Sequence, residues 1–212
     1  MVRSFECPVC GAKVEVSKEN IITPLSTKRI KVLLCPRPAS AQHVVRVKYG
    51  EKWERPEEFL ISPKDGLHEV VPGSRDEVAH YILRSELIRT GGPHVSGAYV
   101  SKVVKIKILW KDWRAVGYYS EFVHLPVPVL AELYVRPEYR NRGYATEMVK
   151  DFLNSHPGPV AFYFIHKKCM RNLLMKAGVI QKTSDRYIID DRIRLLYWQA
   201  NPIPFWESDK YD

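Results

Sequence analysis

The most informative stretch of this chain is LYVRPEYRNRGYATEMV, residues 133–149. Its pattern predicts a strand that ends at Val135, then a turn and a basic loop that opens directly into a helix. Backbone N–H groups at such a helix start, together with the helix dipole, favour a phosphate. Gly143 lets the backbone approach that phosphate closely, and Arg140 and Arg142 add positive charge. The stretch therefore predicts a pyrophosphate-binding site.

The same stretch resembles the acetyl-coenzyme A signature of the GNAT acetyltransferase superfamily, [Q/R]-x-x-G-x-[G/A]. The pattern is present here as RNRGYA, residues 140–145, and ELYVRPEYR before it is similar to the family's fourth strand and turn. The resemblance extends over about residues 67–198. It implies an α+β fold whose mixed sheet splays between its fourth and fifth strands, with acetyl-CoA between them.

The resemblance also implies how acetyl-CoA is held. Its pantetheine would pair with backbone groups of the strand, and its pyrophosphate would lie on the loop. A backbone N–H near Val135 would polarise the thioester carbonyl. The implied cofactor-binding residues are Leu133, Tyr134, Val135, Arg140, Asn141, Arg142, Gly143, Tyr144, Ala145 and Thr146.

Acyl transfer to an amine needs a base, because the attacking amine must be neutral. The resemblance suggests Glu132 on the fourth strand, with Glu121 and His124 near the end of the previous strand as alternatives. Many family members carry a Tyr as general acid four residues before a helix-ending Gly, but this chain has Leu174 there. The substitutes that stay open are Tyr163, His166, Cys169 and Tyr197.

The N-terminal segment carries a second motif, Cys-Pro-Val-Cys-Gly at residues 7–11, followed by Cys35 and His43. Two thiolates from one tight turn and a second ligand pair some 25 residues later are typical of a tetrahedral zinc site. We therefore expect a zinc-ribbon-like β module with Cys7, Cys10, Cys35 and His43 as ligands. His68 is an alternative fourth ligand, and a redox pair or plain buried thiols are the competing interpretations.

The remaining pattern predicts the order of the other elements. Ser74 and Glu77 are typical of a capping box that opens a helix, which ends at Gly91. Residues 98–135 predict three strands, with a turn at Asp112. A strand near 160–166, a helix near 167–178 and a final hairpin joined at 190–191 follow. The expected domains are a zinc-binding module at 1–50, a linker or first strand at 51–73 and the GNAT domain at 74–212.

Composition bounds the remaining possibilities. Of the 212 residues, 45% are hydrophobic and 27% are charged, which argues against disorder, collagen and a disulfide scaffold. No apolar stretch is long enough for a spanning helix, and no signal-peptide pattern is present, so we expect a cytoplasmic protein that does not bind membranes. The net charge of +9 makes nucleic acid a possible partner.

Two functions follow from these patterns. The first is an acetyl-CoA-dependent N-acetyltransferase with structural zinc, acting on an amine of a protein, with a small-molecule amine as the alternative. The second is a zinc-containing factor that binds nucleic acid or protein, with a GNAT fold that binds CoA but turns over weakly. The sequence leaves the acceptor and the oligomeric state open.

Overall fold

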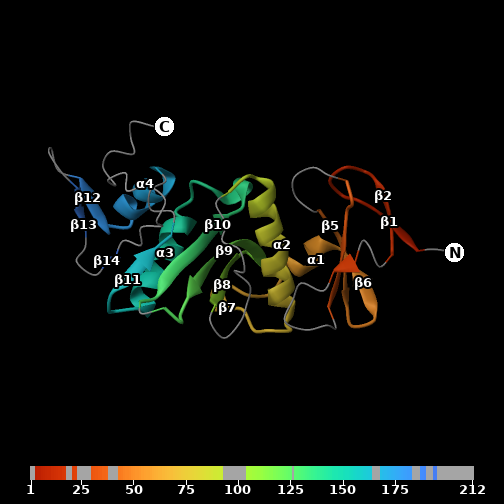
Figure 1. Cartoon of the computed structure of the whole chain (residues 1–212), viewed down its shortest axis with the longest axis horizontal. Coiled ribbons are helices and arrows are strands. Elements are labelled where there is room, and N and C mark those ends of the chain that lie inside the picture. Colours follow the sequence, from red (N-terminus) through yellow and green to blue (C-terminus); the bar gives the residue numbers. More distant parts are fainter. Residues whose placement is uncertain are drawn as a thin grey trace.

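The computed structural model describes residues 3–17, 21–22, 30–37, 43–92, 104–125, 127–163, 168–182, 187–189 and 193–194. Its elements form successive layers (Figure 1). A small sheet lies at the N-terminal end, α1 and α2 lie next to it, the main sheet follows, and α3 and α4 cover the far side. The helices are α1 (Pro56–Phe59), α2 (Arg75–Arg89), α3 (Tyr144–Ser155) and α4 (Lys168–Lys176).

The main sheet has six strands in the order β14-β11-β10-β9-β8-β7. Neighbours from β7 to β10 are antiparallel, whereas β11 and β14 join in parallel, so the predicted mixed sheet is confirmed. The hairpin of β8 and β9 turns at Asp112 and Trp113, both with positive φ, as predicted for this position. The strands are β7 (Gly66–Glu69), β8 (Val104–Lys111), β9 (Arg114–Phe122), β10 (Val129–Val135), β11 (Val160–Phe162) and β14 (Ile193–Arg194).

The N-terminal part consists of a hairpin and a small sheet. The hairpin pairs β1 (Ser4–Glu6) with β2 (Lys13–Glu15). The small sheet contains β3 (Ile21–Ile22), β4 (Lys31–Leu34), β5 (Val44–Tyr49) and β6 (Lys52–Glu54). Because β6 pairs with β5, this sheet continues past the expected boundary at residue 50, and the segment expected as linker or first strand holds β6, α1 and β7.

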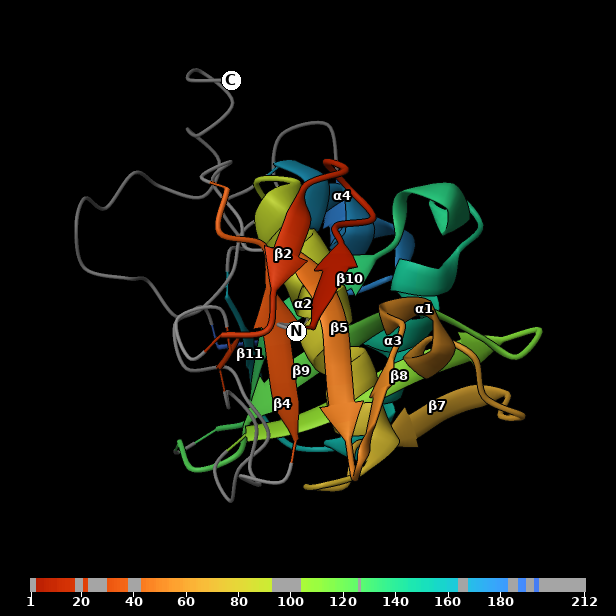
Figure 2. The same cartoon turned by 90° about the vertical axis from the view of Figure 1, so that its right-hand side faces the viewer.

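Two hydrophobic cores flank the main sheet. On one face, α2 packs between the two sheets, so Val47 of the small sheet, Leu83 of α2 and Ile108 of the main sheet belong to one buried cluster. On the other face, Phe152 of α3 and Leu174 of α4 pack against the sheet in a second cluster. Figure 2 looks onto the face of the small sheet, which lies in front of α2 and the main sheet. The N-terminal module therefore shares its core with the rest of the chain.

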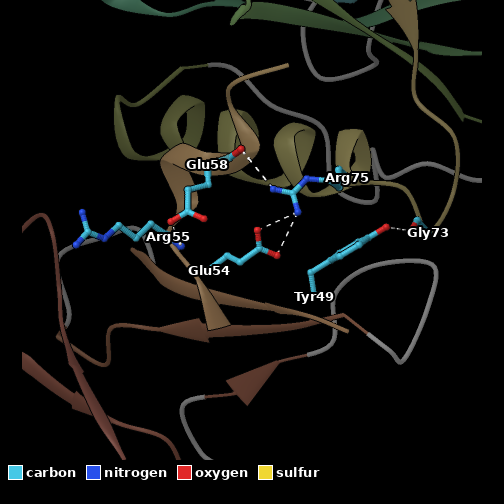
Figure 3. Close-up of polar contacts among 6 residues, drawn as sticks. All are labelled: Tyr49, Glu54, Arg55, Glu58, Gly73 and Arg75. Carbon is cyan, nitrogen blue, oxygen red and sulfur yellow. Dashed lines mark hydrogen bonds and ion pairs between the residues drawn. The ribbon is translucent and has the colours of Figure 1, made fainter. Parts of the chain in front are cut away.

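An arginine at the start of α2 fixes the small sheet to the helices (Figure 3). Arg75 donates to both carboxylate oxygens of Glu54 on β6, at 2.9 and 3.1 Å, and its guanidinium lies 4.2 Å from the ring centroid of Phe59 on α1. Nearby, the Tyr49 hydroxyl donates to the carbonyl of Gly73 at 3.2 Å. These contacts connect β5, β6, α1 and α2 at one junction.

The helix ends follow the sequence signals. The Ser74 side chain caps α2 by accepting from the Glu77 N–H, as predicted, while the Glu77 carboxylate accepts from the N–H of Gly73. After α4, Gly178 adopts φ +79, which only a residue without a β-carbon takes easily. Among the described residues, no helix is both long and apolar enough to cross a membrane.

The predicted hairpin at the C-terminal end is wrong in its pairing. β12 (Ile180–Lys182) pairs antiparallel with β13 (Tyr187–Ile189), whereas β14 joins β11 in the main sheet. The turn expected at 190–191 and part of the strand expected from residue 98 lie outside the described residues. Short apolar runs do not specify which neighbour they pair with, so the pattern could not choose between these arrangements.

Candidate functional site

The four predicted metal ligands come together at the N-terminal end of the molecule. One donor atom each from Cys7, Cys10, Cys35 and His43 lies within 4.8 Å of all the others. The Cys7 Sγ is 3.7 Å from the His43 Nδ1, and the Cys10 Sγ is 3.6 Å from the Cys35 Sγ. His68 lies on β7, where its ring contacts the carbonyl of Asp65, and it is not part of this cluster.

Local backbone structure explains the clustering. The Gly11 N–H donates to the carbonyl of Cys7 at 3.0 Å, and Gly11 takes φ +68 to close the knuckle. The Cys35 N–H donates to the carbonyl of His43 at 2.9 Å, which places the second ligand pair on adjacent chain segments. Burial raises the pKa of Cys35 to about 11, whereas a backbone hydrogen bond from Ala12 is the main cause that lowers the pKa of Cys10.

The donor set fits a tetrahedral zinc ion. Zinc bound ~2.3 Å from sulfur and ~2.0–2.1 Å from nitrogen would place neighbouring ligand atoms roughly 3.5–3.8 Å apart. The two measured separations, 3.6 and 3.7 Å, agree with this geometry. Three thiols and an imidazole also bind zinc in preference to hard cations such as Mg²⁺, which favour oxygen ligands. The cluster can therefore hold one structural metal ion.

A second candidate site is a cavity of about 670 Å³ on the opposite side of α2. It is bounded by the C-terminal half of β10, the loop before α3, the start of α3, one face of α4 and the end of α2. Its volume is in the range of small-molecule and cofactor sites. The described lining residues are Leu87, Thr90, Gly92, Leu133, Tyr134, Val135, Arg140, Asn141, Gly143, Tyr144, Ala145, Thr146, Cys169, Met170, Asn172, Leu173 and Lys176.

Nine of the ten expected cofactor-binding residues thus line one cavity, and the tenth, Arg142, lies beside it in sequence. The arginines are directed by backbone contacts: the Arg140 Nε donates to the carbonyl of Val135 at 3.1 Å, and Arg142 donates to that of Glu138 at 3.2 Å. Arg142 also lies over the ring of Tyr139, at 5.7 Å from its centroid. Both guanidiniums remain exposed and keep further N–H groups for an anion.

The start of α3 supplies backbone donors to the cavity. Gly143 is the N-cap residue, with φ +85. The first N–H groups of a helix have no intrahelical partner, and the dipole makes this end positive. A β-carbon on Gly143 would meet nothing within 4 Å, so glycine is required there by its backbone conformation and leaves open space in front of the helix. This arrangement suits a phosphate.

The free edge of β10 supplies a second set of backbone groups. The Arg136 N–H donates to the carbonyl of Val116 on β9, and Tyr134 is paired with Tyr118. Because backbone groups alternate between the two sides of a strand, those of Leu133 and Val135 point away from β9 and towards the cavity. An extended chain lying along this edge can therefore hydrogen-bond to Leu133 and Val135.

The edge is free because β10 and β11 stop pairing. They are in register at Leu130 and Phe162, and the Tyr163 N–H donates to the carbonyl of Leu130 at 2.9 Å. β10 then continues for five residues without a described partner on that side. A bulge at Ala131 shifts its register with β9, and a bulge bends and twists a strand. The part of β10 beyond this divergence contributes Leu133, Tyr134 and Val135 to the cavity lining.

Glu132 does not line the cavity. Its side chain is fully buried and faces α2, where Arg84 donates to both carboxylate oxygens, at 3.2 and 3.3 Å. The Tyr118 hydroxyl donates to the same carboxylate at 2.9 Å. His80 packs edge-on against the Tyr118 ring, and its two ring nitrogens have no hydrogen-bond partner within the described part of the chain. This buried polar cluster holds the Glu132 carboxylate in one position.

The two alternative bases lie elsewhere. Glu121 is buried on the α3 face of the sheet, with its carboxylate 2.7 Å from the Nε2 of His156. His124 is exposed beyond the end of β9, where its ring packs against Phe122. The three residues expected to act as base are therefore not brought together, and none of them is among the described lining of the cavity.

The candidate acids are separated in the same way. Leu174 is fully buried in the core of α4 and carries no proton to donate. Cys169 is exposed at the start of α4 and lines the cavity. Tyr163 stands at the point where β10 and β11 diverge, and burial raises its pKa. His166 and Tyr197 lie outside the described residues.

Sequence reasoning missed three residues that shape the site. A β-carbon on Gly117 would lie 2.2 Å from the carbonyl oxygen of Tyr134, so glycine is needed where β9 passes the cavity-lining part of β10. A glycine inside a strand is a signal of such close approach. Arg84 and Tyr118, which hold Glu132, gave no signal, because their partner lies 48 and 14 residues away in the sequence.

Comparison with known proteins leaves the family unassigned. No protein-family model and no curated protein matches the chain. The chain is similar to a solved structure of a predicted acetyltransferase with acetyl-CoA from Clostridium acetobutylicum, with 14% identity over 57% of this chain and 79% of the other, and a TM-score of 0.31. An aminoglycoside acetyltransferase from an uncultured soil metagenomic sample is 17% identical over 59% of this chain and 97% of its own, with a TM-score of 0.35.

A third solved structure is an integron cassette protein from the mobile metagenome of Cole Harbour Salt Marsh. It is 16% identical over 61% of this chain and 74% of the other, with a TM-score of 0.30. Values this low do not assign an activity to the chain. The functional argument therefore rests on the chain's own residues and on the geometry of its two sites.

Proposed function

We propose that the chain is an acetyl-CoA-dependent N-acetyltransferase. The observation that carries the proposal is the meeting, in one cavity, of the N-terminus of α3 and the unpaired edge of β10. The first offers N–H donors and positive potential for a pyrophosphate, and the second offers an edge for the amide-containing pantetheine. The loop 140–146 that joins them resembles the acetyl-CoA signature.

The proposed reaction is direct attack of a neutral amine on the thioester carbonyl. The amine nitrogen forms a bond to the acetyl carbon, the carbon–sulfur bond breaks, and CoA leaves as a thiolate that takes up a proton. The Val135 N–H, which faces the cavity, is the candidate donor to the carbonyl oxygen. Tyr163 is the candidate proton donor to the thiolate, because it lies where β10 and β11 diverge and a tyrosine hydroxyl is protonated at neutral pH.

Glu132 is the first candidate for the base, with Glu121 and His124 as alternatives. It immediately precedes Leu133, whose backbone faces the cavity. Since its carboxylate accepts hydrogen bonds from Arg84 and Tyr118, a proton from the amine would reach it through a water molecule rather than by direct contact. The acceptor that we propose is an amine of a protein rather than of a small molecule.

We also propose that Cys7, Cys10, Cys35 and His43 bind one zinc ion with a structural role. Zinc would tie the knuckle between β1 and β2 to the end of β4 and the start of β5. A site with four protein ligands has no open position for substrate, so it contributes to folding rather than to the reaction.

A transfer assay tests the proposed activity. The protein is incubated with acetyl-CoA and a panel of peptides and small amines, while released CoA thiol is measured and products are identified by mass spectrometry. We expect thiol release that depends on an amine, together with an acetylated product. Gly143→Glu, which places a negative charge before α3, should abolish the reaction, and Gly158→Glu, at an exposed glycine beyond α3, should not.

A second function is favoured by two observations. Leu174 is buried where the resembling family commonly has its acid, and the best candidate base is enclosed. A binding factor that retains acetyl-CoA without efficient turnover would fit both. Saturable acetyl-CoA binding combined with no acetylated product across the panel would support this function and would contradict the enzyme.

A further inference from the structure

Two arginines converge on one aromatic ring at the N-terminal end of the molecule. The guanidinium carbon of Arg3 lies 5.1 Å from the ring centroid of Phe5, and that of Arg46 lies 4.9 Å from it. Arg3 directly precedes β1, and Arg46 lies on β5, so the two charges come from separate segments. Through the shared ring they are no more than about 10 Å apart.

Neither charge is neutralised by a carboxylate within the described part of the chain. Three other arginines, Arg75, Arg84 and Arg136, each meet a glutamate. Among the described residues, the polar contact of the Arg46 side chain is its donation to the neighbouring carbonyl of Val45, at 2.7 Å. Two guanidiniums of like charge held close together leave a local positive potential that an anion would relieve.

The ring of Phe5 is supported by packing on its neighbours. Phe5 packs against Trp53 of β6, with 6.0 Å between ring centroids, and both border a small buried cluster that contains Leu33 and Val45. Guanidiniums that lie over an aromatic face keep their in-plane N–H groups available. The cluster is therefore a preorganised pair of forked donors.

The positive surface continues along the same face of the small sheet. Arg46 is opposite Leu33, and two residues further along, Lys48 is opposite Lys31. Since every second residue of a strand points to the same face, Lys31 and Lys48 extend the row that Arg46 begins. Lys48 also pairs with the exposed Glu51 at 3.2 Å, a weak contact that an anion can replace.

We propose that this surface, formed by Arg3, Phe5, Arg46, Trp53, Lys31 and Lys48, binds the phosphate backbone of a nucleic acid. Guanidinium forks match phosphate oxygens, and a row of cations along a strand matches a linear polyanion. In Figure 1 the β1 and β2 hairpin is at the opposite end of the molecule from α4, so the surface is separate from the cavity proposed for acetyl-CoA. It does not depend on that cavity's function.

Fluorescence anisotropy with labelled single-stranded RNA and duplex DNA, measured over a range of salt concentrations, tests the proposal. The test variant is Arg3→Gln/Arg46→Gln. The matched control is Arg114→Gln/Lys150→Gln, which removes the same charge from exposed positions on β9 and α3. Circular dichroism and thermal melting confirm that each variant is folded. Arg3→Glu, at an exposed position, replaces the double variant should that one misfold.

We expect the wild type and the control to bind at least one of the two probes, with affinity that falls steeply with salt. The test variant should bind roughly 10- to 100-fold more weakly at 0.1 M salt, with a log–log slope smaller by about 1.4–1.8, because two phosphate contacts are lost. No binding by the wild type, or equal losses in test and control variants, would overturn the proposal. Equally strong competition by polyglutamate would also overturn it, in favour of an acidic protein partner.

Discussion

Gly117 has no β-carbon, and this allows β9 and β10 to approach each other closely beside the cavity. Gly117→Ala would push a methyl group against the Tyr134 carbonyl oxygen, 2.2 Å away in the present backbone. Overpacking of this kind costs about 1–3 kcal/mol, and it would displace the strand whose edge faces the cavity. We expect a lower melting temperature and weaker acetyl-CoA binding. Gly158→Ala, with open space around its β-carbon, is the control; equal melting of the two variants would contradict the argument.

His80 should make stability depend on pH. Burial, with a smaller contribution from Arg84, lowers its pKa to about 3, whereas an unfolded His titrates near 6.5. Between these values the unfolded chain binds one more proton than the folded chain, so the free energy of unfolding should fall as pH falls below 6.5, by up to about 1.4 kcal/mol per unit. The contribution of neutral His80 to the free energy of unfolding is fully present above pH 6.5.

Denaturant unfolding of wild type and His80→Leu from pH 4 to 8 measures this contribution. Carboxylates affect both proteins, so the informative quantity is the difference between their curves. We expect that the wild type loses stability more steeply than the variant below pH 6.5 and that the curves are parallel above it. Parallel curves over the whole range would contradict the assigned neutral state of His80.

Substitution of Glu132 can distinguish a chemical role of this residue from a structural one. Glu132→Gln would leave Arg84 buried without its charge partner, and breaking a buried pair costs about 3–5 kcal/mol. If Glu132 is also the base, turnover should fall ~100- to 10,000-fold at neutral pH and recover at high pH, where free amine is abundant. Acetyl-CoA affinity should persist in folded protein. Turnover that falls in proportion at every pH would indicate a structural role alone.

At the scale of single elements, the proposed metal site should determine whether the N-terminal hairpin is held in place. The β1–β2 hairpin has three pairs in its ladder, and Cys7 and Cys10 lie in the connection between its strands. We expect about one zinc per chain in protein purified without chelator, and a large loss of it in Cys10→Ser. Cys169→Ser, which removes an exposed thiol outside the cluster, should retain the metal. A metal-free wild type with intact fold and stability would contradict the site.

The elements that sequence could predict are those whose signals are local. Gly143 before α3, Ser74 before α2 and the turn at Asp112 each act through their own backbone, so their positions were found from the pattern alone. α1 lies in the segment that the sequence predicts as linker or first strand, because its single turn at 56–59 is stabilised by packing of Phe59 against the small sheet and α2 rather than by periodicity. The formation of α1 therefore depends on tertiary contacts.

At the scale of the whole molecule, the layered arrangement was beyond the sequence. The pattern separated an N-terminal module from a larger domain, yet α2 lies between their sheets and a single buried cluster spans all three. Likewise, the signature loop could be found from its residues, whereas the enclosure of Glu132 by Arg84 and Tyr118 depends on how α2 packs on the sheet. Contacts between residues far apart in the sequence cannot be predicted from local residue spacing.

The shared core predicts that the two parts unfold together. Removing the metal with a chelator should lower the melting temperature of the whole chain in one transition, because Val47 and Leu83 belong to the same cluster as Ile108. Calorimetry, or circular dichroism compared with tryptophan fluorescence, would reveal this behaviour. Two well-separated transitions, of which only the first responds to metal, would show that the module is an independent unit.

Calorimetric titration of acetyl-CoA tests the central claim most directly. The wild type and Gly158→Glu should bind one acetyl-CoA per chain with similar affinity, and Gly143→Glu should show no saturable binding, since its carboxylate would occupy the space before α3 where the pyrophosphate is proposed to lie. Wild-type protein that fails to bind acetyl-CoA, or a Gly143→Glu variant that binds it as tightly as the wild type, would contradict the account.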